Sequence, residues 1–265
     1  MSISRLENRH MGGGSKMSSD ALVVDVSPDW AVACDIQQRF MQGLDRATDT
    51  LDYSARCRQV RALGGDCYDF VSLPGNRLAL AVGDASGKSL AAALLISNVQ
   101  SSLRTAALFT GNDGPAMLKA VNRQVHASSL ENQYATLFYG VFDRATRTLL
   151  YVNAGHNSPM VFRRNSSISW LETGGAPIGM FPDWTYKEGA VQLNPGDLVV
   201  AYTDGVIEAV NPAGEEWGVE GIRKAAAENC AQSAEDIVQA IFTSMDEFSQ
   251  GHQADDATIV ILRVH

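Results

Sequence analysis

The sequence predicts an α+β fold in which largely antiparallel sheets are covered by helices. Strand-like segments occur before, between and after two groups of helical segments, and the chain closes on a strand. Short turns that contain Pro, Gly or Asp join neighbouring strands, and such turns favour antiparallel pairing. With 265 residues the chain is long enough for one large domain or two small ones, and it carries no internal repeat.

The composition is that of a globular protein. Hydrophobic residues make up 45% and charged residues 19%, and the apolar runs are too short to span a membrane. Asp and Glu outnumber Lys and Arg by 30 to 21, so the net charge is -9 and nucleic-acid binding is not expected. The four cysteines lie far apart without a histidine cluster, which predicts neither a zinc site nor a disulfide framework and favours a reducing cytoplasm.

The first 50 residues are predicted to precede the main domain. Residues 1–20 lack the apolar core of a secretory signal and contain a Gly-rich stretch, so they are interpreted as a disordered leader or the scar of an expression tag. Residues 21–50 are interpreted as an N-terminal linker region with one helix. Residues 51–265 then form the main domain.

The linker helix is predicted over residues 27–42. It starts at Ser27-Pro28-Asp29, which combines an N-cap, a proline at the first helical position and an early acid. Val32, Ile36 and Phe40 follow as one apolar stripe. So short a helix must bury its stripe, either on its own domain or against a dimer partner or an upstream sensor, and the spacing favours neither alternative.

The main domain is predicted to open with strands and to continue with two helices. Strand patterns occur between about Asp52 and Asp84, where the turn Pro74-Gly75-Asn76 marks an antiparallel hairpin. One helix is predicted from about Ser89 to Phe109, and a second begins at Pro115. The later strands are expected at residues 134–142, 148–152, 160–162, 168–171, 190–193, 198–202 and 258–263, with helices at 219–229 and 234–248.

Acidic residues gather in short, glycine-flanked loops beside apolar strands. Carboxylates that converge at such strand ends would repel one another unless a cation neutralised them. Hard oxygen ligands select magnesium or manganese, so a pair of divalent ions is the implied cofactor. Taken singly, each loop is equally well explained as turn chemistry, and their convergence is an expectation. The loops are residues 64–69 (GGDCYD), 83–88 (GDASGK), 202–205 (YTDG) and 254–258 (ADDAT).

Seven motifs occur in order between residues 64 and 263. They are GGDCYD, GDASGKS, YATLFYGVFD, YVNAGHNSP, GAPIGM, LNPGDLVVAYTDGVIEA and QADDATIVILR. Together they closely resemble the bacterial SpoIIE/RsbU-type serine phosphatases of the metal-dependent protein phosphatase superfamily. The likeness covers the chain after residue 50, and the helix around residues 36–38 resembles the linker helix before such domains. The ordered set is specific, whereas one motif alone would be weak evidence.

This resemblance implies a four-layer αββα sandwich with a site for two Mn²⁺ or Mg²⁺ ions at one end. It makes Asp84 the carboxylate shared by both ions, accompanied by the backbone carbonyl of Ala85. Asp204 and one acid of the Asp255-Asp256 pair complete the shell of one ion, with Asp255 favoured. The implied catalytic residues are Asp66, Asp84, Asp204 and Asp255, and the implied metal set adds Ala85 and Asp256 to these four, with Asp66 binding directly or through water.

Five further positions bear on the chemistry. The chain departs from the family pattern at Cys67, Ala85 and Ser89, and none of these changes removes an implied ligand; Ser89 is expected to narrow the approach of substrate. The unperturbed pKa of a histidine side chain would suit His156 to the role of general acid, but its position in a loop at a strand end favours a structural role. Lys88 either attracts phosphate or begins the following helix in solvent.

Two other kinds of phosphate chemistry are disfavoured. Residues 83–89 miss the phosphate-binding loop pattern G-x-x-x-x-G-K-[ST] by one residue, and Asp84 would repel the phosphates there. No cysteine begins a Cys-x5-Arg loop, so a thiol nucleophile is not expected. Water activated by a metal is the nucleophile that remains.

The resemblance implies a cytoplasmic protein-serine/threonine phosphatase in which metal-activated water attacks phosphorus. Its implied substrate is a phosphorylated anti-sigma-factor antagonist of a bacterial partner-switching pathway. A homodimer through the N-terminal helix is a second expected partnership. The alternatives are a catalytically silent partner-binding module, which the presence of every acidic position disfavours, and a phosphomonoesterase for small metabolites, which turnover of sugar phosphates would identify.

Overall fold

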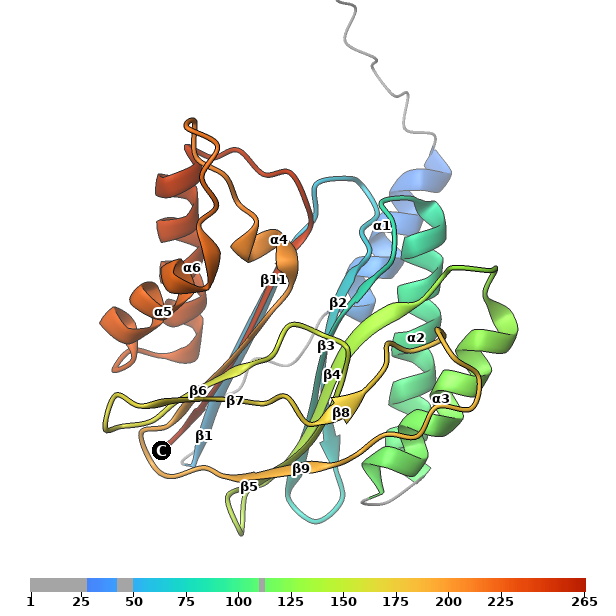
Figure 1. Cartoon of the computed structure of the whole chain (residues 1–265), viewed down its shortest axis with the longest axis horizontal. Coiled ribbons are helices and arrows are strands. Elements are labelled where there is room, and N and C mark those ends of the chain that lie inside the picture. Colours follow the sequence, from blue (N-terminus) through green and yellow to red (C-terminus); the bar gives the residue numbers. More distant parts are fainter. Residues whose placement is uncertain (1–27, 42–49, 110–112) are drawn as a thin grey trace, which may run out of the picture.

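The protein is built from four layers, with two sheets face to face and helices on both outer sides (Figure 1). The structure, a computed structural model, describes residues 28–41, 50–109 and 113–265. The leader predicted for residues 1–20 and the two end residues of the predicted linker helix lie outside the described residues. Among the helices that are described, none is both long and apolar enough to cross a membrane.

The first sheet has five strands, and each is antiparallel to its neighbours. Its central part depends on the last strand of the chain, which is almost wholly buried because its apolar run faces side chains on both surfaces. In order across the sheet the strands are β1 (Leu51–Arg58), β11 (Ala257–Val264), β10 (Leu198–Tyr202), β6 (Met160–Phe162) and β7 (Ile168–Trp170).

The second sheet has six strands and contains the predicted hairpin. Leu73 and Arg77 pair at its end, and Gly75 and Asn76 in the turn have left-handed φ angles of 79° and 60°. One short strand runs parallel to its neighbour, and the others are antiparallel. The strands are β2 (Asp66–Leu73), β3 (Arg77–Ala85), β4 (Ala135–Asp143), β5 (Thr148–Ala154), β8 (Gly174–Gly175) and β9 (Gly189–Gln192), the last two both pairing with β5.

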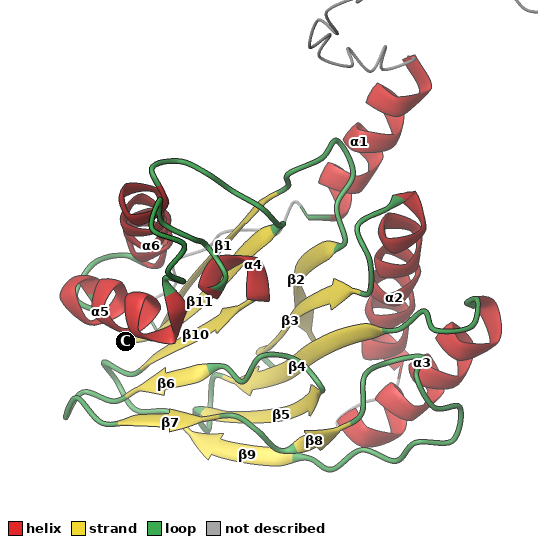
Figure 2. Ribbon diagram, turned by 45° about the horizontal axis from the view of Figure 1, so that its top comes forward, coloured by secondary structure: helices red, strands yellow, loops and turns green. Residues whose placement is uncertain are grey.

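Helices cover the outer face of each sheet, as Figure 2 shows from a second direction. α2 and α3 lie on the second sheet, and α5 and α6 lie on the first. A short helix, α4, follows β10 directly. The bounds are α2 (Leu90–Phe109), α3 (Gly114–Ser128), α4 (Asp204–Ile207), α5 (Gly218–Asn229) and α6 (Ala234–Ser249).

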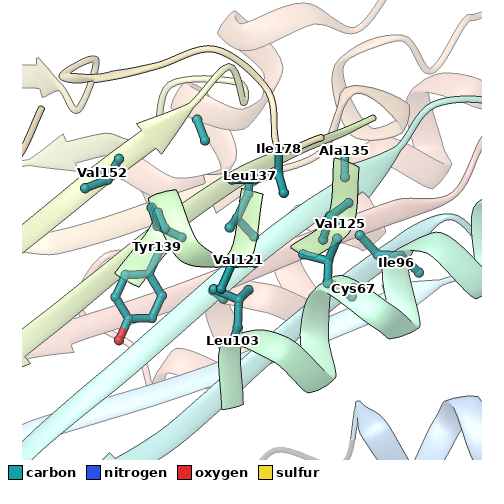
Figure 3. Close-up of a cluster of buried hydrophobic side chains, with 14 of the residues drawn as sticks. Cys67, Ile96, Leu103, Val121, Val125, Ala135, Leu137, Tyr139, Val152 and Ile178 are labelled. Carbon is teal, nitrogen blue, oxygen red and sulfur yellow. The ribbon is translucent and has the colours of Figure 1, made fainter. Parts of the chain in front are cut away.

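Three buried clusters hold the layers together. One lies between the two sheets, one between the first sheet and α5 and α6, and one between the second sheet and α2 and α3. Figure 3 shows this last cluster, where Ile96 and Val125 from the two helices meet Leu137 of the sheet. Each fully buried aliphatic side chain of this kind contributes about 1.5–3 kcal/mol to folding. The predicted four-layer sandwich is confirmed.

The N-terminal helix α1 (Pro28–Phe40) lies beside α2 and packs mainly through polar contacts. Gln37 is buried, and its side-chain amide donates to the carbonyl of Gly64 at 2.8 Å and accepts from the N–H of Gly64 at 3.1 Å. Val32 and Ile36 are 56% and 51% exposed. Packing of the whole apolar stripe on the chain's own domain is therefore wrong for these two residues.

The elements that the sequence did not predict separately are the shortest ones. β8 has two glycines and α4 has four residues, so neither is long enough to show a periodic pattern. β8 can lie this close to β5 because residue 174 is a glycine. A Cβ atom at this position would come within 1.8 Å of the carbonyl oxygen of Asn153. The helix predicted at residues 219–229 begins one residue earlier, at Gly218.

His156 is a buried residue of the loop after β5. The ring atom Nδ1 of His156 lies 2.9 Å from the Thr136 hydroxyl, and the backbone N–H of His156 donates to Asn153 Oδ1 at 2.7 Å. Asn153 in turn donates to the carbonyl of His156 at 3.0 Å, which closes the loop. Burial lowers the pKa of His156 to about 4, because the imidazolium would lose its hydration. These are the contacts of a structural loop residue in its neutral form.

The contribution of His156 to stability is expected to disappear in mild acid. In the unfolded chain the imidazole gains its proton near pH 6.5, whereas in the fold it stays neutral until about pH 4. The stability that this difference provides is present above pH 6.5 and is lost as the pH falls towards 4, by up to about 3 kcal/mol. Urea unfolding of the wild type and of His156→Gln at pH 7.5, 5.5 and 4 measures it.

The difference in unfolding free energy between the wild type and His156→Gln should shrink from pH 7.5 to pH 4, because only the wild type loses the contribution of the neutral imidazole. The carboxyl groups titrate alike in both proteins, so their effect cancels in this difference. A difference in unfolding free energy that stays constant with pH would contradict the neutral, buried imidazole.

Candidate metal centre

Four acidic segments meet at one end of the sandwich. Asp66 at the start of β2 lies opposite Asp84 at the end of β3 in the strand register. Asp204 follows the end of β10, and the Asp255-Asp256 pair precedes the start of β11, which lies beside it. Asp84, Asp255 and Asp256 line one pocket of about 80 Å³. The expected convergence of the acidic loops is therefore what the chain forms.

Asp66 joins the two sheets at this end. Its side chain is buried, and Oδ2 accepts hydrogen bonds from the hydroxyls of Thr203 at 2.7 Å and Thr258 at 2.6 Å. Thr203 Oγ1 also accepts from the N–H of Thr258 at 2.9 Å. Burial raises the pKa of Asp66 well above its ordinary value, and the two hydroxyl donors oppose that rise. Asp66 thus fixes the spacing between the strands that carry the other acids.

Asp84 and Asp204 are held close to like charges. Burial and the neighbouring carboxylates of Asp204 and Asp255 raise the pKa of Asp84 to about 7. Burial and then the charge of Asp255 raise the pKa of Asp204. Half-buried carboxylates that repel one another are stabilised by a cation, and their oxygen donors suit Mg²⁺ or Mn²⁺.

Gly65 leaves open the space that the implied metal ligands face. A Cβ atom on Gly65 would lie 3.4 Å from Asp84 Oδ1 and 3.3 Å from the carbonyl oxygen of Ala85. The Asp84 carboxylate and the Ala85 carbonyl therefore border the same small volume, as the resemblance implies for two ligands of one ion. The donor set at this point consists of oxygen atoms alone, which fits a hard divalent cation.

The two acids of the Asp255-Asp256 pair have different contacts. Asp256 accepts from the N–H of Val60 and of Gly65, both at 2.8 Å, so each of its oxygens binds the loop before β2. Asp255 accepts from the N–H of Asp256 through Oδ1, and its Oδ2 lies 2.6 Å from the ammonium of Lys88. The hydrogen bond that the Lys88 ammonium donates to Asp255 raises the pKa of Lys88. Asp255 is therefore the member with an oxygen toward a cation.

The carboxylates stand around the pocket without forming a closed shell. Within residues 28–41, 50–109 and 113–265, no three His, Cys, Asp or Glu side chains are gathered at metal-ligand geometry. Lys88 instead supplies the positive charge beside Asp255, through the ion pair at 2.6 Å. Ser89 lines the same pocket, and its effect on the approach of substrate stays a prediction.

Sequence reasoning missed the residues that position the acids. Thr203 and Thr258 lie within the acidic loops of residues 202–205 and 254–258, and this placement was the available signal. Gln37 of α1 holds Gly64 in the loop before β2, and no local sequence pattern indicates that contact. Cys67 lies on the helix side of β2, away from Asp66, and burial raises the pKa of its thiol well above the ordinary value, which agrees with a non-catalytic role.

Comparisons with known proteins point to one family. The family model described as "Stage II sporulation protein E (SpoIIE)" matches residues 74–265. The chain is 28% identical to "Protein IcfG" of Synechocystis sp. over 85% of its own length and 40% of that protein. It is 25% identical to "Phosphoserine phosphatase RsbU" of Bacillus subtilis over 90% of its own length and 71% of that protein. It thus spans less than half of the first relative and most of the second.

The fold has a solved counterpart. The structure of the SiaA-PP2C domain of Pseudomonas aeruginosa superimposes with a TM-score of 0.75, at 22% sequence identity, over 89% of this chain and 94% of that one. The shared layers are the two mostly antiparallel sheets with helices outside. With the family model covering most of its length, the chain belongs to the SpoIIE family, and its fold is that of the PP2C phosphatase domains.

Proposed function

We propose that the chain is a metal-dependent protein-serine/threonine phosphatase. The observation that carries the proposal is the pocket lined by Asp84 and Asp255, with the Ala85 carbonyl beside Asp84 at Gly65, in a chain of the SpoIIE family. The name of RsbU as a phosphoserine phosphatase supports the same activity. The proposed catalytic residues are Asp66, Asp84, Asp204 and Asp255.

The proposed cofactors are two Mn²⁺ or Mg²⁺ ions. When bound, such ions supply Lewis acidity and a water of lowered pKa that can attack phosphorus. The residues that would hold them are Asp84, Ala85, Asp204 and Asp255. The Asp84 carboxylate and the Ala85 carbonyl border the same small volume, and Asp255 has an oxygen beside Lys88. Asp204 is close to Asp84, whose pKa is raised by burial and then by the charge of Asp204. Asp66 would support the site indirectly, because its carboxylate already accepts hydrogen bonds from two hydroxyl groups.

The protein groups around the acids have separate tasks. Asp256 and Gln37 hold the loop of residues 59–65 as one wall of the pocket. Lys88 carries the cationic charge at the rim, and we assign it the attraction of the substrate phosphoryl group once Asp255 binds metal. Hydrolysis then transfers the phosphoryl group from the serine oxygen to water.

The proposed substrate is a phosphorylated anti-sigma-factor antagonist, as the resemblance implies. A pocket of about 80 Å³ suits a phosphoryl group at the end of a side chain better than a whole sugar phosphate. Sugar-phosphate turnover that exceeds phosphoprotein turnover would establish the metabolite phosphatase instead, and metal binding without turnover would establish the silent binding module. A cytoplasmic location stays a prediction, with all four cysteines free of disulfides.

Removal of metal or of a metal-holding carboxylate is expected to abolish turnover. Asp84→Asn and Asp204→Asn should each lower kcat/KM with a phosphoserine substrate by more than about 100-fold, because each removes a charge that the ions need. In metal-free buffer at pH 8, Asp84→Asn should leave the unfolding free energy unchanged or higher, since the wild-type charge is repelled there. Full activity after exhaustive chelation would refute the metal-dependent mechanism.

Asp255 and Asp256 are expected to differ in what their loss costs. Asp255→Asn should weaken Mn²⁺ binding by at least about tenfold and change stability by less than about 1 kcal/mol, because it loses one exposed ion pair. Asp256→Asn should lower the unfolding free energy by about 1–2 kcal/mol, because charge-assisted hydrogen bonds to the Val60 and Gly65 amides weaken.

Calorimetric Mn²⁺ titration and urea unfolding of the two variants separate these effects. The opposite pattern, with metal affinity lost in Asp256→Asn and kept in Asp255→Asn, would exchange the two roles.

We further propose that α1 joins two copies of the chain. Val32 and Ile36 are exposed apolar residues on one stripe of this helix. The same helix holds the 59–65 loop through Gln37, so a partner on the stripe would act on the wall of the pocket. Dimer contact and metal-site order are thereby linked.

Ile36→Asp is expected to weaken self-association by at least about tenfold, because a charge would be buried in the interface. Turnover should then become independent of protein concentration at the lower, monomeric value. Sedimentation equilibrium and phosphatase assays over one dilution series measure both quantities, with Arg39→Ala as an exposed control on the same helix. A wild type that stays monomeric at every concentration would contradict the proposal.

A further inference from the structure

A second pocket lies on the other half of the molecule, between α5 and the β6–β7 hairpin. Its volume is about 390 Å³, which falls in the range of small-molecule sites, and it shares no lining residue with the acidic pocket. Its floor is apolar, formed by Phe162, Ile168 and Leu198 of the first sheet. The pocket can therefore take an apolar body.

The rim of this pocket is cationic, although the chain has a net charge of -9. Arg163, Arg164, Arg223 and Lys224 all line it. Two of the four are neutralised by carboxylates: Arg163 by Asp197 at 2.7 Å and Arg223 by Glu220 at 2.6 Å. The other two, Arg164 and Lys224, form no ion pair with any described residue.

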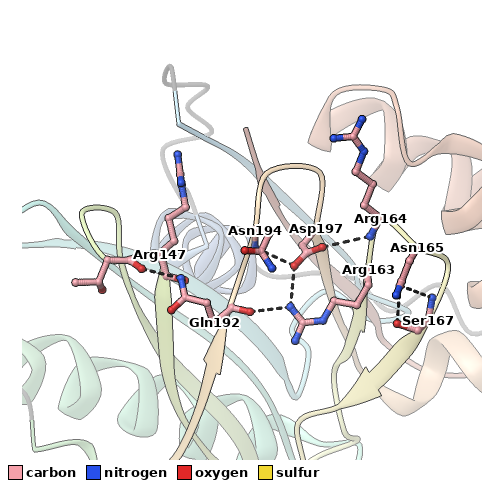
Figure 4. Close-up of polar contacts among 9 residues, drawn as sticks. Arg147, Arg163, Arg164, Asn165, Ser167, Gln192, Asn194 and Asp197 are labelled. Carbon is pink, nitrogen blue, oxygen red and sulfur yellow. Dashed lines mark hydrogen bonds and ion pairs between the residues drawn. The ribbon is translucent and has the colours of Figure 1, made fainter.

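Asp197 fixes the backbone of the hairpin beneath these charges (Figure 4). Its buried carboxylate binds the guanidinium of Arg163 and accepts from the N–H of Arg164 at 3.3 Å. Figure 4 shows the Arg164 side chain extending away from Asp197. The stem of Arg164 packs over Gly196, where an added Cβ atom would lie 3.5 Å from its Cδ. The positive head group of Arg164 therefore lines the pocket without an ion-pair partner among the described residues, and the one carboxylate that lines the pocket, Glu220, is paired with Arg223.

We infer that this pocket binds a small organic anion, with an apolar body on the β6–β10 floor and a phosphate or carboxylate group between Arg164 and Lys224. Two cations without an ion-pair partner among the described residues line this pocket together with apolar side chains, and that combination suits such a ligand, because the anion gains both charges while the body leaves water. An acidic peptide would use the charges but not the enclosed floor. The inference is independent of the proposed phosphatase activity, since the two pockets have no residue in common.

The probes are 2-naphthoate, 2-naphthylphosphonate and the neutral 2-naphthalenemethanol, with inorganic phosphate and hexaglutamate for charge alone. Binding to the full chain is followed by calorimetry and by ¹H–¹⁵N chemical-shift changes. The two naphthyl anions are expected to bind at least about fivefold more tightly than the neutral alcohol, with shifts in α5 and the β6–β7 hairpin. The stronger of the two anions tells whether phosphate or carboxylate is preferred.

Variants separate charge from cavity. The double reversal Arg164→Glu with Lys224→Glu should weaken anion binding by at least about tenfold, whereas Arg123→Glu, an exposed arginine on α3, should change it less than about twofold. Ala227→Trp keeps the charges and fills the pocket, so it should remove naphthyl binding as well. Circular dichroism and thermal unfolding check that each variant folds.

Three results would overturn the inference. They are no binding of either naphthyl anion at millimolar concentration, equal binding of the neutral alcohol, and anion binding that the double reversal leaves unchanged. Shift changes confined to the acidic pocket would likewise assign the anions to the other site.

Discussion

The hydrogen bonds from Thr203 and Thr258 to Asp66 are the contacts on which the acidic end of the molecule depends. A buried carboxylate is costly unless donors replace its water, and here both donors come from the opposite sheet. Because Asp204 follows Thr203 and Asp255 lies shortly before Thr258 in the chain, the bridge also sets where these acids stand relative to Asp84. One buried group therefore converts sheet packing into the arrangement of acids at the proposed metal site.

Close backbone approach is the second requirement at this end. A Cβ atom on Gly205 would come within 2.0 Å of the carbonyl oxygen of Asp256, and one on Gly64 would come within 2.4 Å of its carboxylate. The glycines thus let the loops after β10, before β11 and before β2 touch one another. Both carboxylate oxygens of Asp256 accept hydrogen bonds from backbone amides, whereas Asp255 keeps one oxygen beside the ammonium of Lys88.

The order of strands and helices could be predicted because their apolar patterns are long and regular. The acidic loops could also be found, since each lies next to such a strand. The residues themselves do not separate the tasks of Asp255 and Asp256, which only the family resemblance distinguished by favouring Asp255, because two adjacent identical residues differ only in the backbone amides that they meet. Gln37 and the Asp66 bridge depend on contacts between segments far apart in the sequence, and no local pattern encodes the distance between two sheets.

The charges of the molecule are divided between the two ends of β10. Beyond Tyr202, at one end, Asp204 joins a group of acids whose repulsion favours a cation. Near Leu198, at the other end, Asp197 neutralises Arg163 and leaves Arg164 and Lys224 to face solvent. Because the net charge of -9 would repel the proposed phosphoprotein substrate at long range, its capture would rest on short-range contacts, and Lys88 and Arg61 are the cations that line the acidic pocket. The cationic pocket shares no lining residue with the acidic one and lies near the other end of β10, so a ligand of its own is the role that we infer for it.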